Sequence, residues 1–137
     1  MRFSPDKDNT AYTIRAYQAR RITVISPAFS TEDANPGANE IQLTRSFVIA
    51  PKRLVENWPP QSLPELTLQH LQTIVDLDPE LVILGTGSVI DFPAPALTEM
   101  LLTKGIGVEI MDTAAACRTY NVLMHEGRHV VAALIID

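Results

Sequence analysis

The chain has very little of what small proteins use as covalent or membrane anchors. Its 137 residues contain one cysteine, so an intramolecular disulfide is excluded and a reducing, cytoplasmic environment is expected. The longest apolar run, residues 130–136, is far too short to span a bilayer as a helix. Residues 1–8 include no apolar stretch and are too acidic for a typical targeting peptide.

Basic residues are also in the minority. Eleven Lys and Arg stand against 16 Asp and Glu, a formal net charge of -5, which disfavours a nucleic-acid-binding surface. Arg15, Arg20 and Arg21 lie close together in the sequence, and we interpret them as a solvated strand edge rather than a phosphate site. The length and the 46% apolar content fit one domain, 1–137, with a flexible N-terminus at 1–11.

The first third of the chain has the pattern of antiparallel strands. Three segments alternate between apolar and polar residues with period two, and the predicted strands are 12–17, 21–26 and 41–49. The first two are expected to form a hairpin, and residues 27–39 to form a loop. Four prolines within 51–64 predict an irregular crossover, in which we expect Trp58 to cover one end of the core rather than to line a ligand groove.

The rest of the chain alternates helices with short apolar strands. The predicted helices are 66–77, opened by Ser62 or Leu63 with Pro64 in the first turn, 95–104, and 114–125, capped by Asp112 or Thr113. The predicted strands are 81–84, 106–111 and 129–136. This order predicts a β-α-β-α-β unit with parallel pairing and right-handed crossovers.

One motif suggests zinc chemistry. Residues 125–129 read His-Glu-Gly-Arg-His, which matches the H-E-x-x-H motif of zinc peptidases. That motif needs both histidines on one helical face, but Gly127 is expected to end the helix and residues 130 onward to form a strand. We therefore predict no metal site here.

Two strand ends are better candidates for a ligand site. Gly85-Thr86-Gly87-Ser88 follows a buried strand and resembles the start of a dinucleotide-binding fingerprint, although its third glycine position holds Ile90. A turn that requires positive φ explains these glycines equally well.

The second strand end, Asp112 with Thr113, is expected at the same edge of a parallel sheet. Asp112 is a candidate acid/base or ligand-contact group, and it is also a good helix N-cap, which is the role we favour. A tentative ligand site thus combines both strand ends.

The helix that follows has two faces. One stripe, which includes Cys117 and Tyr120, is predicted to face the sheet, so we interpret Cys117 as a small buried hydrophobe and not as a nucleophile. Arg118, Asn121 and His125 are predicted to face outward and form a tentative interaction surface.

The motif-bearing segments resemble a domain family of unknown function. The resemblance rests on residues 81–87, 105–123 and 126–128, and the segment Met-Asp-Thr-Ala-Ala-Ala-Cys-Arg-Thr-Tyr-Asn at 111–121 is similar to the bacterial subgroup. The family includes a mitochondrial complex I assembly factor and an adipogenesis-associated cytosolic protein. The resemblance implies a three-layer α/β fold with a mixed central sheet and additional antiparallel N-terminal strands. It implies no accepted enzymatic activity and no cofactor.

Two functions follow as hypotheses. The first is a non-catalytic protein-interaction or assembly-factor-like module with a protein partner. The alternative is a small-molecule-binding protein or enzyme that uses the rim formed by Gly85, Thr86, Gly87, Ser88 and Asp112. The sequence leaves self-association open and predicts neither a nucleic-acid partner nor a membrane span.

Overall fold

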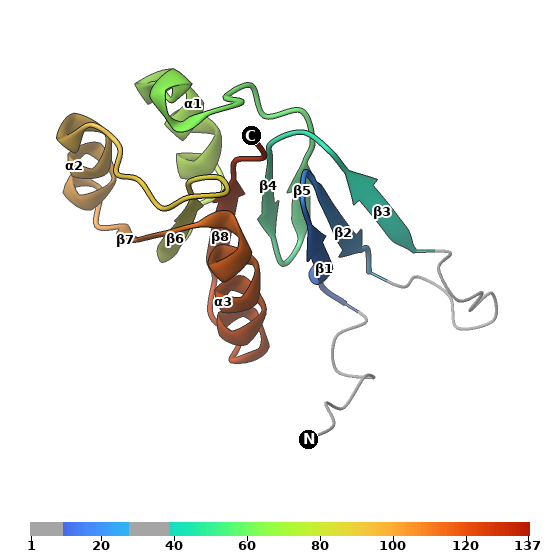
Figure 1. The fold of residues 1–137 in the computed structure, drawn as a ribbon. Coiled ribbons are helices and arrows are strands. Elements are labelled where there is room, and N and C mark those ends of the chain that lie inside the picture. Colours follow the sequence, from blue (N-terminus) through green and yellow to red (C-terminus); the bar gives the residue numbers. More distant parts are fainter. Residues whose placement is uncertain (1–9, 28–38) are drawn as a thin grey trace.

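The protein is built in three layers (Figure 1). The computed structural model describes residues 10–27 and 39–137, so most of the predicted flexible terminus and of the predicted 27–39 loop lies outside the described residues. The strands are β1 Thr13–Gln18, β2 Arg21–Ile25, β3 Glu40–Leu43, β4 Phe47–Ala50, β5 Arg53–Val55, β6 Leu81–Gly85, β7 Gly107–Met111 and β8 Val130–Leu134. The helices are the short 3-10 helix η2 Leu63–Glu65, α1 Leu68–Val75, α2 Pro95–Thr103 and α3 Thr113–His125.

A five-stranded sheet forms the central layer. Its strand order is β5-β4-β8-β6-β7; β6 pairs in parallel with both β7 and β8, as predicted, whereas β4 runs antiparallel to its neighbours β5 and β8. Every residue of β4, β6 and β8 is buried. These strands are continuous apolar runs because both faces of the sheet are covered.

The N-terminal strands form a sheet of their own. The order is β1-β2-β3, all antiparallel, and the predicted hairpin of β1 with β2 is confirmed. The turn of this hairpin holds Arg20 at φ 64°, in the left-handed region. Figure 1 shows this sheet beside α3, whereas α1 and α2 lie on the other side of the central sheet.

The prediction of a single strand at 41–49 is wrong. The chain leaves the small sheet after Leu43 and enters the central sheet at Phe47. Ser46 at this corner is fully buried, where its Oγ accepts a hydrogen bond from the Ile136 backbone N–H at 3.0 Å and its carbonyl accepts one from the Trp58 N–H at 3.0 Å. These polar bonds stabilise a change of sheet that an unbroken alternation of residues does not reveal.

The proline-rich crossover contains more regular structure than predicted. It includes β5 and the 3-10 helix η2, which takes up Pro64. The helix α1 therefore begins later than Ser62 or Leu63 suggested. Its N-cap is Thr67, whose hydroxyl accepts the His70 N–H while the His70 ring accepts the Thr67 N–H.

Two apolar cores lie on opposite faces of the central sheet. The first contains side chains of β1, β2, α3 and one face of β4, β6 and β8. The second contains α1, α2 and the other face of the same strands, together with Trp58. Trp58 is 1% exposed and donates its indole N–H to the His70 carbonyl at 3.1 Å, so it covers a core as predicted.

Candidate functional site

Three parallel strands end at one edge of the central sheet. The register pairs Gly85 with Met111 on one side and with Leu134 on the other. The backbone continues the ladder beyond these ends, because the Thr86 N–H donates to the Met111 carbonyl at 2.9 Å and the Ile135 N–H to the Gly85 carbonyl at 3.0 Å. The two candidate segments therefore lie next to each other, as the sequence predicts.

Thr113 ties these strand ends together. Its side chain is 1% exposed; Oγ1 accepts the Gly87 N–H at 2.8 Å and donates to the Ile135 carbonyl at 2.7 Å. The Thr113 N–H in turn donates to the Gly87 carbonyl at 2.9 Å. Asp112 is the N-cap of α3, where its Oδ1 accepts the Ala115 N–H at 2.8 Å, so the favoured capping role is confirmed.

The two glycines are explained by packing within the protein. A Cβ at Gly85 would lie 3.0 Å from both Leu134 Cδ2 and Thr113 Oγ1. Gly87 has φ +111° and a Cβ there would meet Asp137 Oδ2 at 2.3 Å. Close approach to a pyrophosphate is therefore not needed to account for either residue.

The backbone donors of this turn are already engaged. The N–H groups of Thr86 and Gly87 donate to Met111 and Thr113, and the Ser88 N–H donates to Asp137 Oδ1 at 3.1 Å. A phosphate bound here would have to displace these acceptors, unlike in a dinucleotide fold, where such groups point at the ligand. A ligand at Gly85–Ser88 stays a prediction that this geometry does not favour.

The turn leads into an exposed apolar loop, which we define as residues 88–92. Val89, Ile90 and Phe92 are 70%, 49% and 67% exposed. The loop is held from inside, because Thr86 Oγ1 donates to the Val89 carbonyl at 2.8 Å and accepts the Asp91 N–H at 3.1 Å. The polar residues of the predicted rim thus serve to fix a loop whose presented surface is hydrophobic.

The outward face predicted for α3 is only partly present. Arg118 and His125 are exposed, and His125 Nδ1 lies 2.6 Å from the Asn121 carbonyl. The prediction is wrong for Asn121, whose amide points at β1. Its Oδ1 accepts the Ile14 N–H at 2.9 Å and its Nδ2 donates to the Ile14 carbonyl at 2.6 Å. The carboxamide pairs with the strand edge as a neighbouring strand would.

The inward face of α3 is as predicted. Cys117 is 3% exposed, and burial raises the pKa of its thiol to about 12, with Arg118 lowering it and Asp112 raising it to smaller extents. Tyr120 is fully buried and donates its hydroxyl to the Tyr12 carbonyl at 2.8 Å, and burial raises its pKa. Cys117 is therefore a buried thiol, not an activated nucleophile.

The two histidines of the H-E-x-x-H motif lie on different elements. α3 ends at His125, and Gly127 has φ +83°, which stops the helix. His129 lies outside the helix, and its N–H donates to Glu80 Oε1 at 2.9 Å. Within residues 10–27 and 39–137, no three His, Cys, Asp or Glu side chains are grouped to hold a metal ion. In the same part of the chain, no helix is long and apolar enough to cross a membrane.

This architecture has relatives. Residues 30–135 match the family described as a protein of unknown function, DUF498/DUF598. The chain belongs to this family. It is 37% identical over 90 residues to NADH dehydrogenase (ubiquinone) 1 alpha subcomplex assembly factor 3 of Mus musculus, an alignment that covers 64% of this chain and 48% of the mouse protein. The protein of the same description in Danio rerio is 36% identical over 128 residues, 92% of this chain and 71% of that protein.

A DUF498/DUF598 chain of this length spans about half of the mouse relative. The fold is shared with bacterial proteins: a crystal structure from Bordetella parapertussis superposes with a TM-score of 0.77 at 36% identity, over 93% of this chain and 98% of that chain. The family resemblance and the mixed α/β fold expected from the sequence are thus confirmed.

The apolar loop is the feature that sequence reasoning passed over. Val89, Ile90 and Phe92 lie between turn residues and have no helical or strand period, so the sequence pattern assigns them to no element. The signal was present: three large apolar residues within a segment too short to form an element of its own. Large apolar residues that no helix or strand buries are candidates for an exposed binding surface.

Proposed function

We propose that this domain is a non-catalytic protein-interaction module of the assembly-factor kind, and that its partner binds the apolar loop, residues 88–92. The observation that carries the proposal is the exposure of Val89, Ile90 and Phe92, at 70%, 49% and 67%. Large apolar side chains that are exposed together mark binding surfaces on folded proteins. The family supports the same function, because relatives over most of this chain are named as assembly factors.

The loop is prepared for binding by its internal bonds. Thr86 Oγ1 bridges the Val89 carbonyl and the Asp91 N–H, and Asp91 Oδ1 accepts the Phe92 N–H at 2.8 Å. Ordering a loop on binding lowers affinity, so a loop fixed in advance keeps more of the contact energy. Phe92 would be the anchor, since buried aromatic side chains dominate interface energetics.

Substitution of the apolar loop tests this function. The double variant Val89→Ser/Phe92→Ser should reduce partner affinity by roughly 30-fold or more, the effect of losing a hot-spot cluster, without lowering the melting temperature. Val122→Ser is the matched control, because Val122 is 57% exposed on α3, away from the loop. Affinity purification from the source organism identifies the partner, and titration with the purified partner measures the affinity.

A photo-crosslinking residue defines where the partner sits. Placed at position 92 it should capture the same protein that the wild type retains, whereas at position 122 it should not. Capture of a subunit of NADH dehydrogenase would extend to this chain the assembly role for which its relatives are named. Retention of the partner by the double variant would refute the loop as its site. Binding of the loop to lipid vesicles without any protein partner would refute the proposal itself.

A further inference from the structure

Two hollows meet at Tyr17, beside the predicted rim. One, of about 310 Å³, lies between β1 and α3, and its polar lining includes Arg15, Arg118 and Asn121. The other, of about 420 Å³, lies between the β1–β2 turn and the edge where the central strands end, and Tyr17 lines both. Each volume falls in the range of small-molecule sites.

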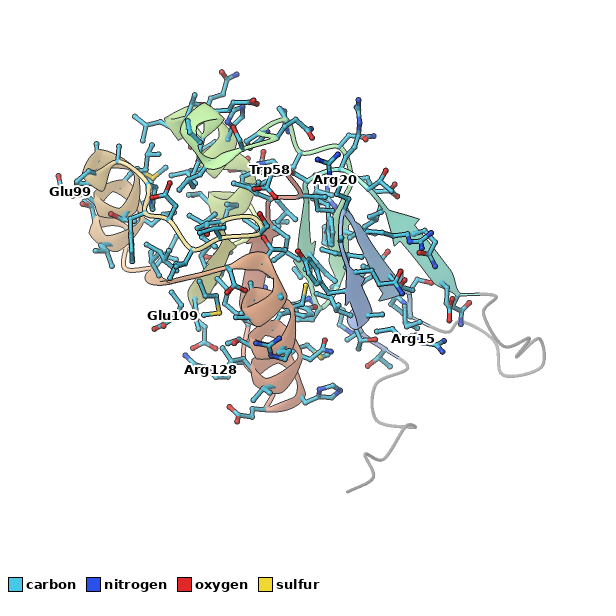
Figure 2. All side chains as sticks on the ribbon, viewed as in Figure 1. Arg15, Arg20, Trp58, Glu99, Glu109 and Arg128 are labelled. Carbon is cyan, nitrogen blue, oxygen red and sulfur yellow. The ribbon has the colours of Figure 1, made fainter. Side chains whose placement is uncertain are left out.

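The polar groups that line these hollows include three hydrogen-bond donors. The Tyr17 hydroxyl is protonated at neutral pH, and burial raises its pKa above the ordinary value, with smaller contributions from Cys117, Asp137 and Asp112. Arg118 lines the first hollow and Arg20 the second. Figure 2 shows Arg20 at the turn end of β1 and Arg15 toward the other end of this strand.

The acidic groups near Tyr17 already accept hydrogen bonds from the protein. Asp112 Oδ1 accepts the Ala115 N–H, and Asp137 Oδ1 accepts the Ser88 N–H. Arg15 is paired with Glu40. In contrast, neither Arg20 nor Arg118 forms an ion pair with any residue of 10–27 or 39–137. Both side chains are exposed, so each guanidinium can turn to a bound acceptor that carries negative charge, although Asp137 lines the second hollow beside Arg20.

The backbone at Arg20 is a separate observation. Its φ of 64° is a conformation that Gly and Asn adopt readily and that other residues adopt at a cost. Such conformations are concentrated at binding sites, where the side chain is needed despite the strain. Arg20 occupies a position of the hairpin turn that its side chain does not suit, and it lines the larger hollow.

We propose that the paired hollows around Tyr17 bind a small organic anion, whose carboxylate or phosphate group accepts hydrogen bonds from Arg20, Arg118 and the Tyr17 hydroxyl. The site is distinct from the apolar loop, and only Ser88 belongs to both. It shares only Ser88 with the predicted rim, because Gly85, Thr86 and Thr113 hold the strand ends and the loop in place.

Thermal shift and calorimetry with matched probes test this site. Succinate tests for recognition of a carboxylate, and glucose 6-phosphate tests for recognition of a phosphate. Succinamide and glucose are their uncharged analogues of similar shape. An anion that binds should raise the melting temperature by about 3–6 °C at ten times its dissociation constant, because it stabilises only the folded state. The neutral analogues should have no effect.

Three variants and one control locate the binding. Arg20→Asn introduces a residue suited to positive φ, so the free protein should keep or raise its melting temperature while the anion-induced shift is lost. Arg118→Gln should also lose the shift, and Tyr17→Phe should weaken binding by about 2- to 10-fold. Arg53→Gln, at an exposed position of β5, should behave as the wild type.

Two results would overturn the proposal. One is the absence of any shift for the wild type with both anions at millimolar concentration. The other is an equal shift in the wild type, Arg20→Asn and Arg118→Gln, which would assign the effect to general ionic stabilisation. If the Val89→Ser/Phe92→Ser variant also lost the anion-induced shift in melting temperature, the anion site and the apolar loop would not be independent.

Discussion

Thr113 and Cys117 are neighbours on α3 that the fold uses in opposite ways. The Thr113 hydroxyl is buried but fully bonded, to the Gly87 N–H and the Ile135 carbonyl. The Cys117 thiol is buried among apolar side chains, which raises its pKa to about 12. A buried polar group is tolerated when it is paired, and a buried ionisable group is tolerated when it stays neutral. The cost of ionising Cys117 can be measured.

The pKa of Cys117 makes stability depend on pH in the alkaline range. Above about pH 9 the unfolded chain loses the thiol proton, whereas the folded protein keeps it up to about pH 12. The folded state then binds more protons than the unfolded state, so the free energy of unfolding falls as pH rises through this window. Between about pH 8 and pH 10 this residue should remove about 1–2 kcal/mol.

Cys117→Ala isolates this contribution. The variant should lose stability at every pH from its smaller side chain, but it should lack the additional fall between about pH 8 and pH 10. The raised pKa of Tyr120 has the same cause, burial, in both proteins, so its contribution cancels in the comparison. Urea unfolding at the two pH values measures the difference; parallel pH profiles for both proteins would show that the thiol already ionises in the folded state.

At the scale of elements, the contact between α3 and β1 depends on Asn121. Its carboxamide satisfies both backbone groups of Ile14 at a strand edge that pairs with no other strand of residues 10–27 and 39–137. Asn121→Ala should lower the free energy of unfolding by about 1–3 kcal/mol, because partly buried N–H and C=O groups lose their partners. The adjacent substitution Val122→Ala, on the exposed side of α3, should change stability by less than about 0.5 kcal/mol.

Urea denaturation of both variants provides the measurement. Hydrogen exchange adds a local readout, since the Ile14 amide should lose protection in Asn121→Ala and keep it in Val122→Ala. If the two substitutions had equal effects on unfolding and on this amide, the carboxamide would not hold the strand edge.

Asn121 also shows what the sequence could predict about these elements. Apolar periodicity placed β6, α2, β7, α3 and β8 within a few residues and indicated their parallel pairing, because burial on one or both faces fixes that pattern. The period of α3 put Asn121 on an outward face, which is wrong because its amide bonds the backbone of Ile14. What that face meets is decided by the separate sheet of β1–β3, and a side chain that bonds a distant strand edge leaves no local pattern.

The same reasoning applies to the candidate site. Parallel topology predicted that Gly85 and Asp112 lie at one edge, and they do. It could not predict that Thr113 and Asp137 would use the donors of that turn, since these bonds join segments 26 and 49 residues apart. The hollows around Tyr17 were beyond prediction for the same reason, because their walls come from four distant segments.

At the scale of the whole molecule, β8 joins the two cores. Alternate residues of this strand face opposite sides of the central sheet. Val130, Ala132 and Leu134 belong to the first core, and Val131 and Ala133 to the second. Because one strand contributes to both, neither core can lose its packing without exposing the other. The expectation of a single domain, made from length and composition, thus becomes a prediction about cooperativity.

Trp58 reports on that cooperativity. It is the only tryptophan and lies in the second core, whereas Ile14 lies in the first. Ile14→Ala should lower the free energy of unfolding by about 2–4 kcal/mol. If the cores unfold together, the urea midpoint from Trp58 fluorescence should shift as far as the midpoint from circular dichroism. Leu71→Ala, in the second core, should likewise move both midpoints equally. A Trp58 transition that stayed in place in Ile14→Ala would instead show that the α1–α2 side unfolds independently of the α3 side.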